Sequence, residues 1–308
     1  KEGVTYGRIV SVLSIGLFLE SAWTKVLQSE GNMKLPMIAQ IAGAVINIIL
    51  DYLLIFGIVF FPALGIAGAA VATVTGQIAA AVIVMTKGFR KSPPLSVYKK
   101  YVKKIYYLGF PNILMQSAYT FYIFGLNMIL KGFSDQAVTT LGLYYKWQSF
   151  FFIPLGAMQT CIVPVISYNY GAGMYDRCKK TLKDAVIFGW TLMIIGTLCF
   201  EIIPGPMLRV FSRDAKVIEI GVNAFHIIGM SFILLVTSLT FPVYFQAIGQ
   251  SVKSSLLTVL RTVVLFVPLG WLFSKLGLKY FWCTFPVTEF ITTAAGVIML
   301  KRFRGNYE

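Results

Sequence analysis

The chain of 308 residues is 57% hydrophobic and only 13% charged, and its mean hydropathy is +0.76. A soluble domain carries roughly 25% charged residues, so this composition excludes an ordinary soluble protein and favours a membrane protein. The net charge of +15 does not indicate nucleic-acid binding, because the lysines and arginines lie in short loops between apolar stretches, which is the pattern that sets membrane orientation.

Nine stretches are apolar enough to cross a bilayer as helices, each with about 20 residues or more. In chain order they are 5–28, 36–60, 65–86, 106–130, 137–167, 182–203, 220–246, 254–274 and 279–300. The period-two alternation that marks the strands of a membrane barrel is absent from the sequence. The sequence therefore predicts an all-α integral membrane fold with nine transmembrane helices.

Basic residues are concentrated in alternate loops. The segment 87–104 contains seven lysines and arginines, the segment 177–183 contains four, and the C-terminal segment 301–304 contains three. With nine spans these segments lie on one side, and the positive-inside rule makes that side cytoplasmic. We therefore expect a multi-pass protein of the inner or plasma membrane with a cytoplasmic C-terminus. Lys1 then lies outside, so an odd number of helices is expected to precede it.

The chain also contains a weak internal repeat. A shift of 218 residues aligns 1–32 with 219–250 without a gap, so the first three spans resemble the last three. A repeat of six helices is even, and the two copies therefore run parallel about an axis along the membrane normal. We expect 1–90 to be the last three helices of an N-lobe whose first three helices are missing. The segment 91–105 would be the cytoplasmic linker, and 106–308 a complete six-helix C-lobe.

Residues 31–77 contain the elements GN-x-K, N-x-x-LD, IFG and GxxGAAxAT. They resemble the signature of the MATE (multidrug and toxic compound extrusion) family around its fifth and sixth helices. The segments 108–119, 164–173 and 245–250 resemble helix starts and ends of the MepA/DinF-like branch. The resemblance implies the twelve-helix, two-lobe fold of the MOP superfamily. It also implies efflux of drugs and other organic cations by alternating access, in antiport driven by a Na⁺ or H⁺ gradient.

Asp51 lies deep in an apolar span, where an unpaired carboxylate is costly. Asn47 is one helical turn earlier, so both side chains share a helix face. A carboxylate and an amide oxygen together suit a hard cation such as Na⁺, or a proton on the carboxylate. The resemblance implies that Thr73 also contributes to this ion site. We expect no cofactor beyond the coupling ion and no metal beyond Na⁺ at Asp51. The alternative is that Asn47 and Asp51 only bond neighbouring helices.

Other polar and aromatic residues within the spans are candidates for a substrate cavity, because flat organic cations bind aromatic faces. These candidates are Glu20, Gln116, Tyr119, Asn127, Tyr145 and Lys146. The alternative for them is lipid-facing packing, bonding between helices or a position at the wet rim of a span. Arg261 and Glu289 are predicted to form a structural ion pair, because an arginine inside a span needs acceptors.

The sequence contains no catalytic constellation, so we expect a transporter and not an enzyme. The expected partners are small organic cations and the lipid bilayer, the expected state is a monomer, and no nucleic-acid partner is expected. The alternative function is a lipid-linked oligosaccharide flippase of the same superfamily. Such a flippase is expected to have a more cationic central cavity than the mixed charges Glu20, Asp51, Lys146, Arg261 and Glu289 indicate.

Overall fold

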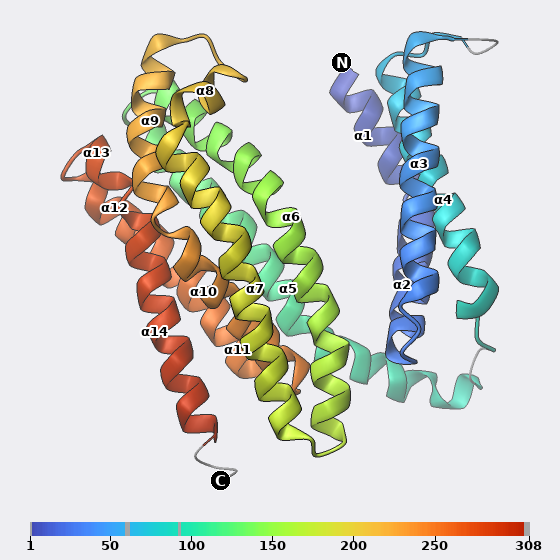
Figure 1. Ribbon diagram of the computed structural model, residues 1–308. Helices are drawn as coiled ribbons and strands as arrows, with labels where there is room; N and C mark the ends of the chain where they lie inside the picture. Colours follow the sequence, from blue (N-terminus) through green and yellow to red (C-terminus); the bar gives the residue numbers. More distant parts are fainter. Residues whose placement is uncertain (1, 59–61, 92–93, 305–308) are drawn as a thin grey trace. The chain divides into compact units, whose positions relative to one another are not determined.

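The computed structural model describes residues 2–58, 62–91 and 94–304, and among these residues it contains helices and no strand (Figure 1). Two compact units can be distinguished, Lys1–Val97 and Tyr98–Glu308. The predicted linker 91–105 includes the division between them, while the assignment of the units to two lobes stays a prediction. The side chain of Gln116, a predicted cavity residue, lies outside the described part of the chain.

The helices follow one another with short connections. The first unit contains α1 (Glu2–Val12), α2 (Ile15–Ser29), α3 (Lys34–Phe56), α4 (Ile66–Gly88) and the start of α5 (Leu95–Lys131). The second contains the rest of α5, α6 (Asp135–Gly171), α7 (Tyr175–Ile202), α8 (Pro204–Arg209), α9 (Ala215–Gly229), α10 (Phe232–Ala247), α11 (Ser251–Val259), the π-helix η1 (Leu260–Phe266), α12 (Val267–Ser274), α13 (Leu278–Phe281) and α14 (Thr284–Arg304).

Every predicted span overlaps a helix of the structure. Among the described residues, six helices are long and apolar enough to cross a membrane: α3, α4, α6, α7, Ser251–Ser274 and Leu278–Phe303. The number rises to eight if each of two bent helix pairs is one span, and these pairs are bent by 47° between α1 and α2 and by 56° between α9 and α10. The count of nine and the repeat layout stay predictions.

The two bent pairs end in the same local structure. After α2, the amide of Asn32 donates to the carbonyl of Leu27, and Gly31 has a φ of 81°. After α10, the amide of Gln250 donates to the carbonyl of Phe245, and the glycine before Gln250 has a φ of 76°. Both are Schellman-type caps, in which glycine takes the left-handed position without steric cost. Leu27 and Phe245 are equivalent under the 218-residue shift, but caps of the same type also follow α3 and α6, so this local match does not test the predicted repeat.

Helix α4 packs against α1, α2 and α3 in the first unit. Its buried face carries a small residue at every fourth position: Gly68, Ala72, Gly76 and Ala80. Small residues at this spacing let helix backbones approach closely in a membrane, where packing replaces the hydrophobic effect as the cause of association. A Cβ atom added to Gly68 would lie only 2.6 Å from the carbonyl oxygen of Leu54 on α3.

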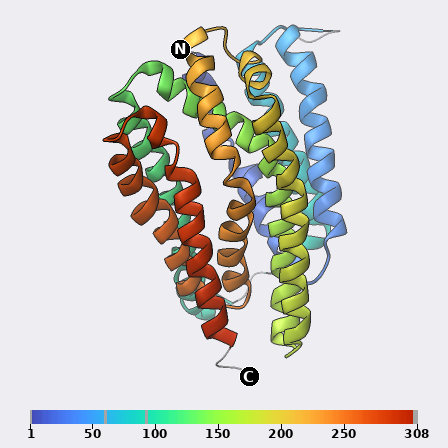
Figure 2. The same ribbon diagram turned by 60° about the vertical axis from the view of Figure 1, so that its left-hand side comes forward.

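In the second unit, α10 contacts α7 on one side and α14 on the other (Figure 2). The core there is rich in aromatic rings. Phe200 and Phe225 stack with their ring centroids 4.4 Å apart, and Tyr144 meets Phe285 edge to face at 5.2 Å. Such pairs add about 0.5–1.5 kcal/mol each beyond their buried area.

A buried ionic cluster joins α10, η1 and α14 within this unit. Arg261 is 4% exposed and Glu289 is 0% exposed. The Nη2 atom of Arg261 lies 2.5 Å from Oε1 of Glu289, and its Nε atom lies 3.0 and 3.1 Å from the two carboxylate oxygens. The Ser238 hydroxyl donates to the same carboxylate. Arg261 and Glu289, which the sequence predicts as an ion pair, are therefore in direct contact. Their contribution to stability can be tested by substitution.

We predict that Arg261→Gln destabilises the protein by roughly 3–5 kcal/mol, because it leaves the Glu289 carboxylate buried without its cation. Thermal unfolding of the purified protein in detergent measures the change. Combining Arg261→Met with Glu289→Met is expected to restore most of the lost stability, because no unpaired charge then remains buried.

The matched control is Arg90→Gln. Arg90 pairs with Glu30 at 2.5 Å, but both side chains are about half exposed, so its loss is expected to cost less than about 1 kcal/mol. Equal destabilisation by Arg261→Gln and Arg90→Gln would contradict the role given to the buried pair.

Candidate functional site

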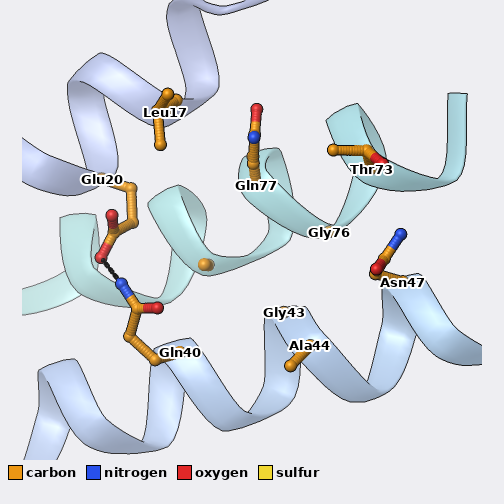
Figure 3. Close-up of a pocket in the computed structure, with 10 residues that line it drawn as sticks. Leu17, Glu20, Gln40, Gly43, Ala44, Asn47, Thr73, Gly76 and Gln77 are labelled. Atoms are coloured by element: carbon orange, nitrogen blue, oxygen red, sulfur yellow. Dashed lines mark hydrogen bonds between the residues drawn. The ribbon is translucent and has the colours of Figure 1, made fainter. Parts of the chain in front are cut away.

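Helices α2, α3 and α4 line a cavity of 290 Å³ within the first unit (Figure 3). Leu17 and Ala44 contribute apolar surface, but half of the lining residues are polar. The polar lining residues are Glu20 on α2, Gln40 and Asn47 on α3, and Thr73 and Gln77 on α4. A concentration of carboxylate, amide and hydroxyl groups between apolar spans makes this cavity a candidate functional site, because each such group is costly in hydrocarbon.

Two glycines bring the walls of the cavity together. A Cβ atom on Gly43 would lie 2.8 Å from the Gly76 carbonyl oxygen, and one on Gly76 would lie 2.6 Å from the Gly43 carbonyl oxygen. The added atom on Gly76 would also lie 3.1 Å from Cβ of Asn47. The close approach of α3 and α4 at this glycine pair therefore places Asn47 near Thr73 at one end of the cavity, as Figure 3 shows.

Glu20 lies at the other end. Its side chain is 6% exposed, and its Oε1 atom accepts hydrogen bonds from the Thr24 hydroxyl at 2.8 Å and from the Gln40 amide at 2.7 Å. Figure 3 shows the Gln40 bond crossing from α3 to α2. Among the described residues, no basic side chain contributes to the cavity lining, so a charged Glu20 gives this pocket a negative potential.

Several polar atoms around Asn47 are buried and have no hydrogen-bond partner in the described part of the chain. They are Nδ2 of Asn47, Oε1 of Gln77 and Oδ1 of Asp51. Buried polar groups are paired in nearly all proteins, and each exception indicates a bound ion, a water or a functional role. Asp51 is one helical turn after Asn47 and is not among the residues that line the cavity, so it lies beyond the Asn47 end.

Thr73 is held by two contacts. Its hydroxyl donates to the Ala69 carbonyl at 2.9 Å, and the Tyr6 hydroxyl lies 3.4 Å from the same oxygen. Because the Thr73 hydroxyl proton goes to Ala69, the Tyr6 hydroxyl is the donor in the second contact, and one lone pair of the Thr73 oxygen remains. Tyr6 also brings α1 to the Asn47 end of the site.

The cavity candidates of the second unit lie in several places. Tyr119 and Tyr145 belong to one tyrosine cluster with Tyr122, and the Tyr119 and Tyr122 rings are 5.0 Å apart. The Nζ atom of Lys146 lies 4.8 Å from the ring centroid of Phe211. Asn127 donates to the Ile123 carbonyl at 2.8 Å.

Asn127 also lines a hollow of 760 Å³ between α5 and α6, together with Lys131 and Asp135. The structure thus brings Tyr119 and Tyr145 together in one cluster. Lys146 lies against Phe211, and Asn127 lines the hollow between α5 and α6.

Sequence reasoning missed Gln40 and Gln77 as site residues. Gln40 lies seven residues before Asn47, and Gln77 four residues after Thr73, so helical periodicity puts each on the face of a predicted ion ligand. A search for uncharged polar side chains at these spacings inside the spans would have found both.

Comparison with known proteins identifies the family of the chain. The sequence profile of the MatE family matches residues 1–53 and 111–272. The chain belongs to the MatE family. It is 26% identical over 288 residues to the multidrug export protein MepA of Staphylococcus saprophyticus, and 24% identical over 291 residues to the probable multidrug resistance protein NorM of Thermotoga maritima. Each alignment covers 90% of the chain and 62% of the relative, so the chain spans about three fifths of these proteins.

Solved structures show that the MatE chain has the fold of this transporter group. An outward-facing multidrug resistance MATE family transporter of the MOP superfamily matches with a TM-score of 0.86 at 20% identity, covering 98% of the chain and 69% of that structure. A MOP superfamily transporter from Pyrococcus furiosus matches with a TM-score of 0.84 at 21% identity and the same coverage. Together with its apolar helices, these matches make the chain a multi-pass membrane protein.

We predict that Gly76→Ala separates α3 from α4, because the new methyl group would lie 2.6 Å from the Gly43 carbonyl oxygen. A forced shift of a packed backbone costs roughly 1–3 kcal/mol, which thermal unfolding in detergent measures. Gly142→Ala on α6 is the control, because a Cβ atom there meets nothing within 4 Å. That control is expected to be neutral or slightly stabilising, and equal melting temperatures for the two variants would contradict the close approach.

Proposed function

We propose that this MatE chain carries part of a secondary antiporter that exports organic cations in exchange for Na⁺ or H⁺. The relatives support this proposal, since the names of MepA and NorM describe multidrug export and multidrug resistance. In the proposed function the protein works as a monomer in the plasma membrane with its C-terminus in the cytoplasm. It uses no cofactor other than the coupling ion, and the lobes alternate between two open states.

The observation that carries the proposal is the set of buried, unpartnered polar atoms at Asn47, Asp51 and Gln77. A hard cation takes oxygen ligands, and carboxylate, amide and hydroxyl oxygens are the available ones here. Asn47 presents its oxygen or its amide nitrogen by rotation about the last side-chain bond, so the same side chain serves an occupied and an empty site. A bound Na⁺ would satisfy the oxygens of Asp51 and of a rotated Asn47, and a proton would satisfy Asp51 alone; neither side chain has its buried atom paired among the described residues.

Glu20 has a second role in this proposal. It shares the cavity with Asn47 and Thr73 but is held by Thr24 and Gln40. Its negative charge raises the local concentration of cations in a pocket with low-dielectric walls. We assign it to attraction of the coupling ion, and we assign binding of the ion to Asp51, Asn47 and Thr73.

We predict that Asp51→Asn abolishes transport coupled to the ion gradient, because it removes the titratable group and the negative charge. The amount of folded protein should stay near normal, since a buried neutral amide costs less than an unpaired carboxylate. Asn47→Ala should weaken ion affinity by about fivefold, the effect of roughly 1 kcal/mol for one neutral ligand. The measurement is uptake of ethidium by inverted membrane vesicles containing the intact protein, under an imposed Na⁺ or H⁺ gradient.

Glu30→Gln is the control for loss of a carboxylate, because Glu30 is about half exposed and pairs with Arg90 away from the cavity. Its coupled transport is expected to equal that of the unchanged protein. Coupled transport by Asp51→Asn at the unchanged level would place the coupling ion elsewhere, and Glu20→Gln would then be the variant that loses coupling.

A further inference from the structure

A groove of 490 Å³ runs between α7, α10 and α14 of the second unit. Its walls are mostly hydrocarbon, from residues such as Val186, Leu234 and Val297. Two lysines, Lys179 and Lys183, lie at one end of it, within the first three turns of α7. The groove is separate from the ion site proposed above, and the transport proposal makes no use of it.

The polar atoms in the walls of the groove are bonded to other wall residues. The indole nitrogen of Trp190 donates to the Thr237 hydroxyl at 3.1 Å, and the Thr293 hydroxyl donates to the Leu234 carbonyl at 3.0 Å. A polar solute therefore meets few hydrogen-bonding groups in these walls that are not already bonded to another wall residue. A hydrocarbon chain loses nothing by entering, because the lining presents apolar surface to it.

The length of the groove fits one leaflet of a bilayer. Eleven residues separate Lys179 from Trp190 on α7, which is about 16 Å at about 1.5 Å per helical residue. The hydrocarbon core of a bilayer is roughly 30 Å thick, so one leaflet is about half of that. The groove thus reaches from a charged helix end to a depth near the end of an acyl chain.

The lysines at one end of the groove give that end a positive charge, which favours a ligand with an anionic headgroup. Lys179 and Lys183 are four residues apart and share a helix face. Together with Arg177 and Lys180 they make four basic residues against two acidic neighbours, Asp176 and Asp184. The Nζ atom of Lys179 lies 3.7 Å from Oδ1 of Asp176, whose side chain is 99% exposed, so this contact is a weak one.

We propose that the groove binds an anionic phospholipid. The phosphate lies against Lys183 and Lys179, and one acyl chain lies along Val186, Trp190 and Val297. A basic pocket between membrane helices on the cytoplasmic side suits an anionic headgroup, and the basic segment of α7 is on the predicted cytoplasmic side. The lipid fills the space between α7 and α14 and holds both helices against α10.

The test uses fluorescence of the purified protein in detergent with added phospholipids that carry bromine on their acyl chains. Bromine quenches an indole that it touches, and Trp190 is 40% exposed within the groove. Brominated phosphatidylglycerol is expected to quench at lower concentration than brominated phosphatidylcholine. The Trp190→Phe variant is expected to lose that difference, because the other four tryptophans lie outside the groove.

Lys183→Gln is expected to reduce the preference for phosphatidylglycerol by about fivefold, the effect of one lysine near a lipid surface. Lys180→Gln is the matched control, because Lys180 has the same charge on the same helix and does not line the groove. Val297→Phe, which fills the groove, should weaken quenching by both lipids. Ile298→Phe, at an exposed neighbouring position, should not.

Three results would overturn the proposal. Equal quenching by the two lipids would remove the headgroup selectivity. Equal effects of Lys183→Gln and Lys180→Gln would show a diffuse surface potential in place of a site. Competition by inorganic phosphate at the same concentration as phosphatidylglycerol would show that the lysines hold a free anion and that the groove takes no chain.

Discussion

Polar side chains inside a membrane-spanning helix must find partners within the protein, because hydrocarbon supplies none. Two buried carboxylates of this chain, Glu289 and Asp51, meet that constraint in different ways. Glu289 is fully buried and accepts bonds from Arg261 and Ser238. Asn47 and Asp51 keep buried polar atoms without partners in the described structure. The first arrangement fits a structural role in a packed core, and the second is the basis for the proposed ion site.

Small residues decide where the unsatisfied groups meet. The Gly43 and Gly76 pair allows α3 and α4 to approach until Asn47 and Thr73 line the same cavity. Larger side chains at these two positions would keep α3 and α4 apart, and Asn47 and Thr73 would then no longer line the same cavity. The conformational freedom that glycine brings to a helix interior is a cost to stability, and the close contact between helices offsets it in a membrane.

Much of the helical architecture could be predicted from apolar runs and from glycine at helix ends, as with Gly31 after α2. The bend between α9 and α10 could not, because only Gly229 and Ser231 mark it within a long apolar stretch, and the bond from the Ser231 hydroxyl to the Ile228 carbonyl forms only in the folded chain. At the site, the single-helix spacing of Asn47 and Asp51 was visible in the sequence. The bond from Gln40 to Glu20 was not, because it depends on the register between two helices.

The number of existing hydrogen bonds ranks the buried carboxylates as coupling groups. An ion that binds and leaves in every cycle must replace the hydrogen bonds that its ligands make in the empty site. A carboxylate that is bonded to an arginine must first break those bonds. Both Nε and Nη2 of Arg261 donate to Glu289. Neutralising Glu289 by a proton or an ion would therefore leave a buried guanidinium without its counter-charge. Glu20 would give up two neutral bonds, to Thr24 and Gln40. Asp51 has a buried oxygen with no hydrogen-bond partner among the described residues. A cation that binds this oxygen therefore breaks no existing hydrogen bond. This ranking favours Asp51 as the coupling group in the proposed function, and it favours a structural role for Glu289 and its partners.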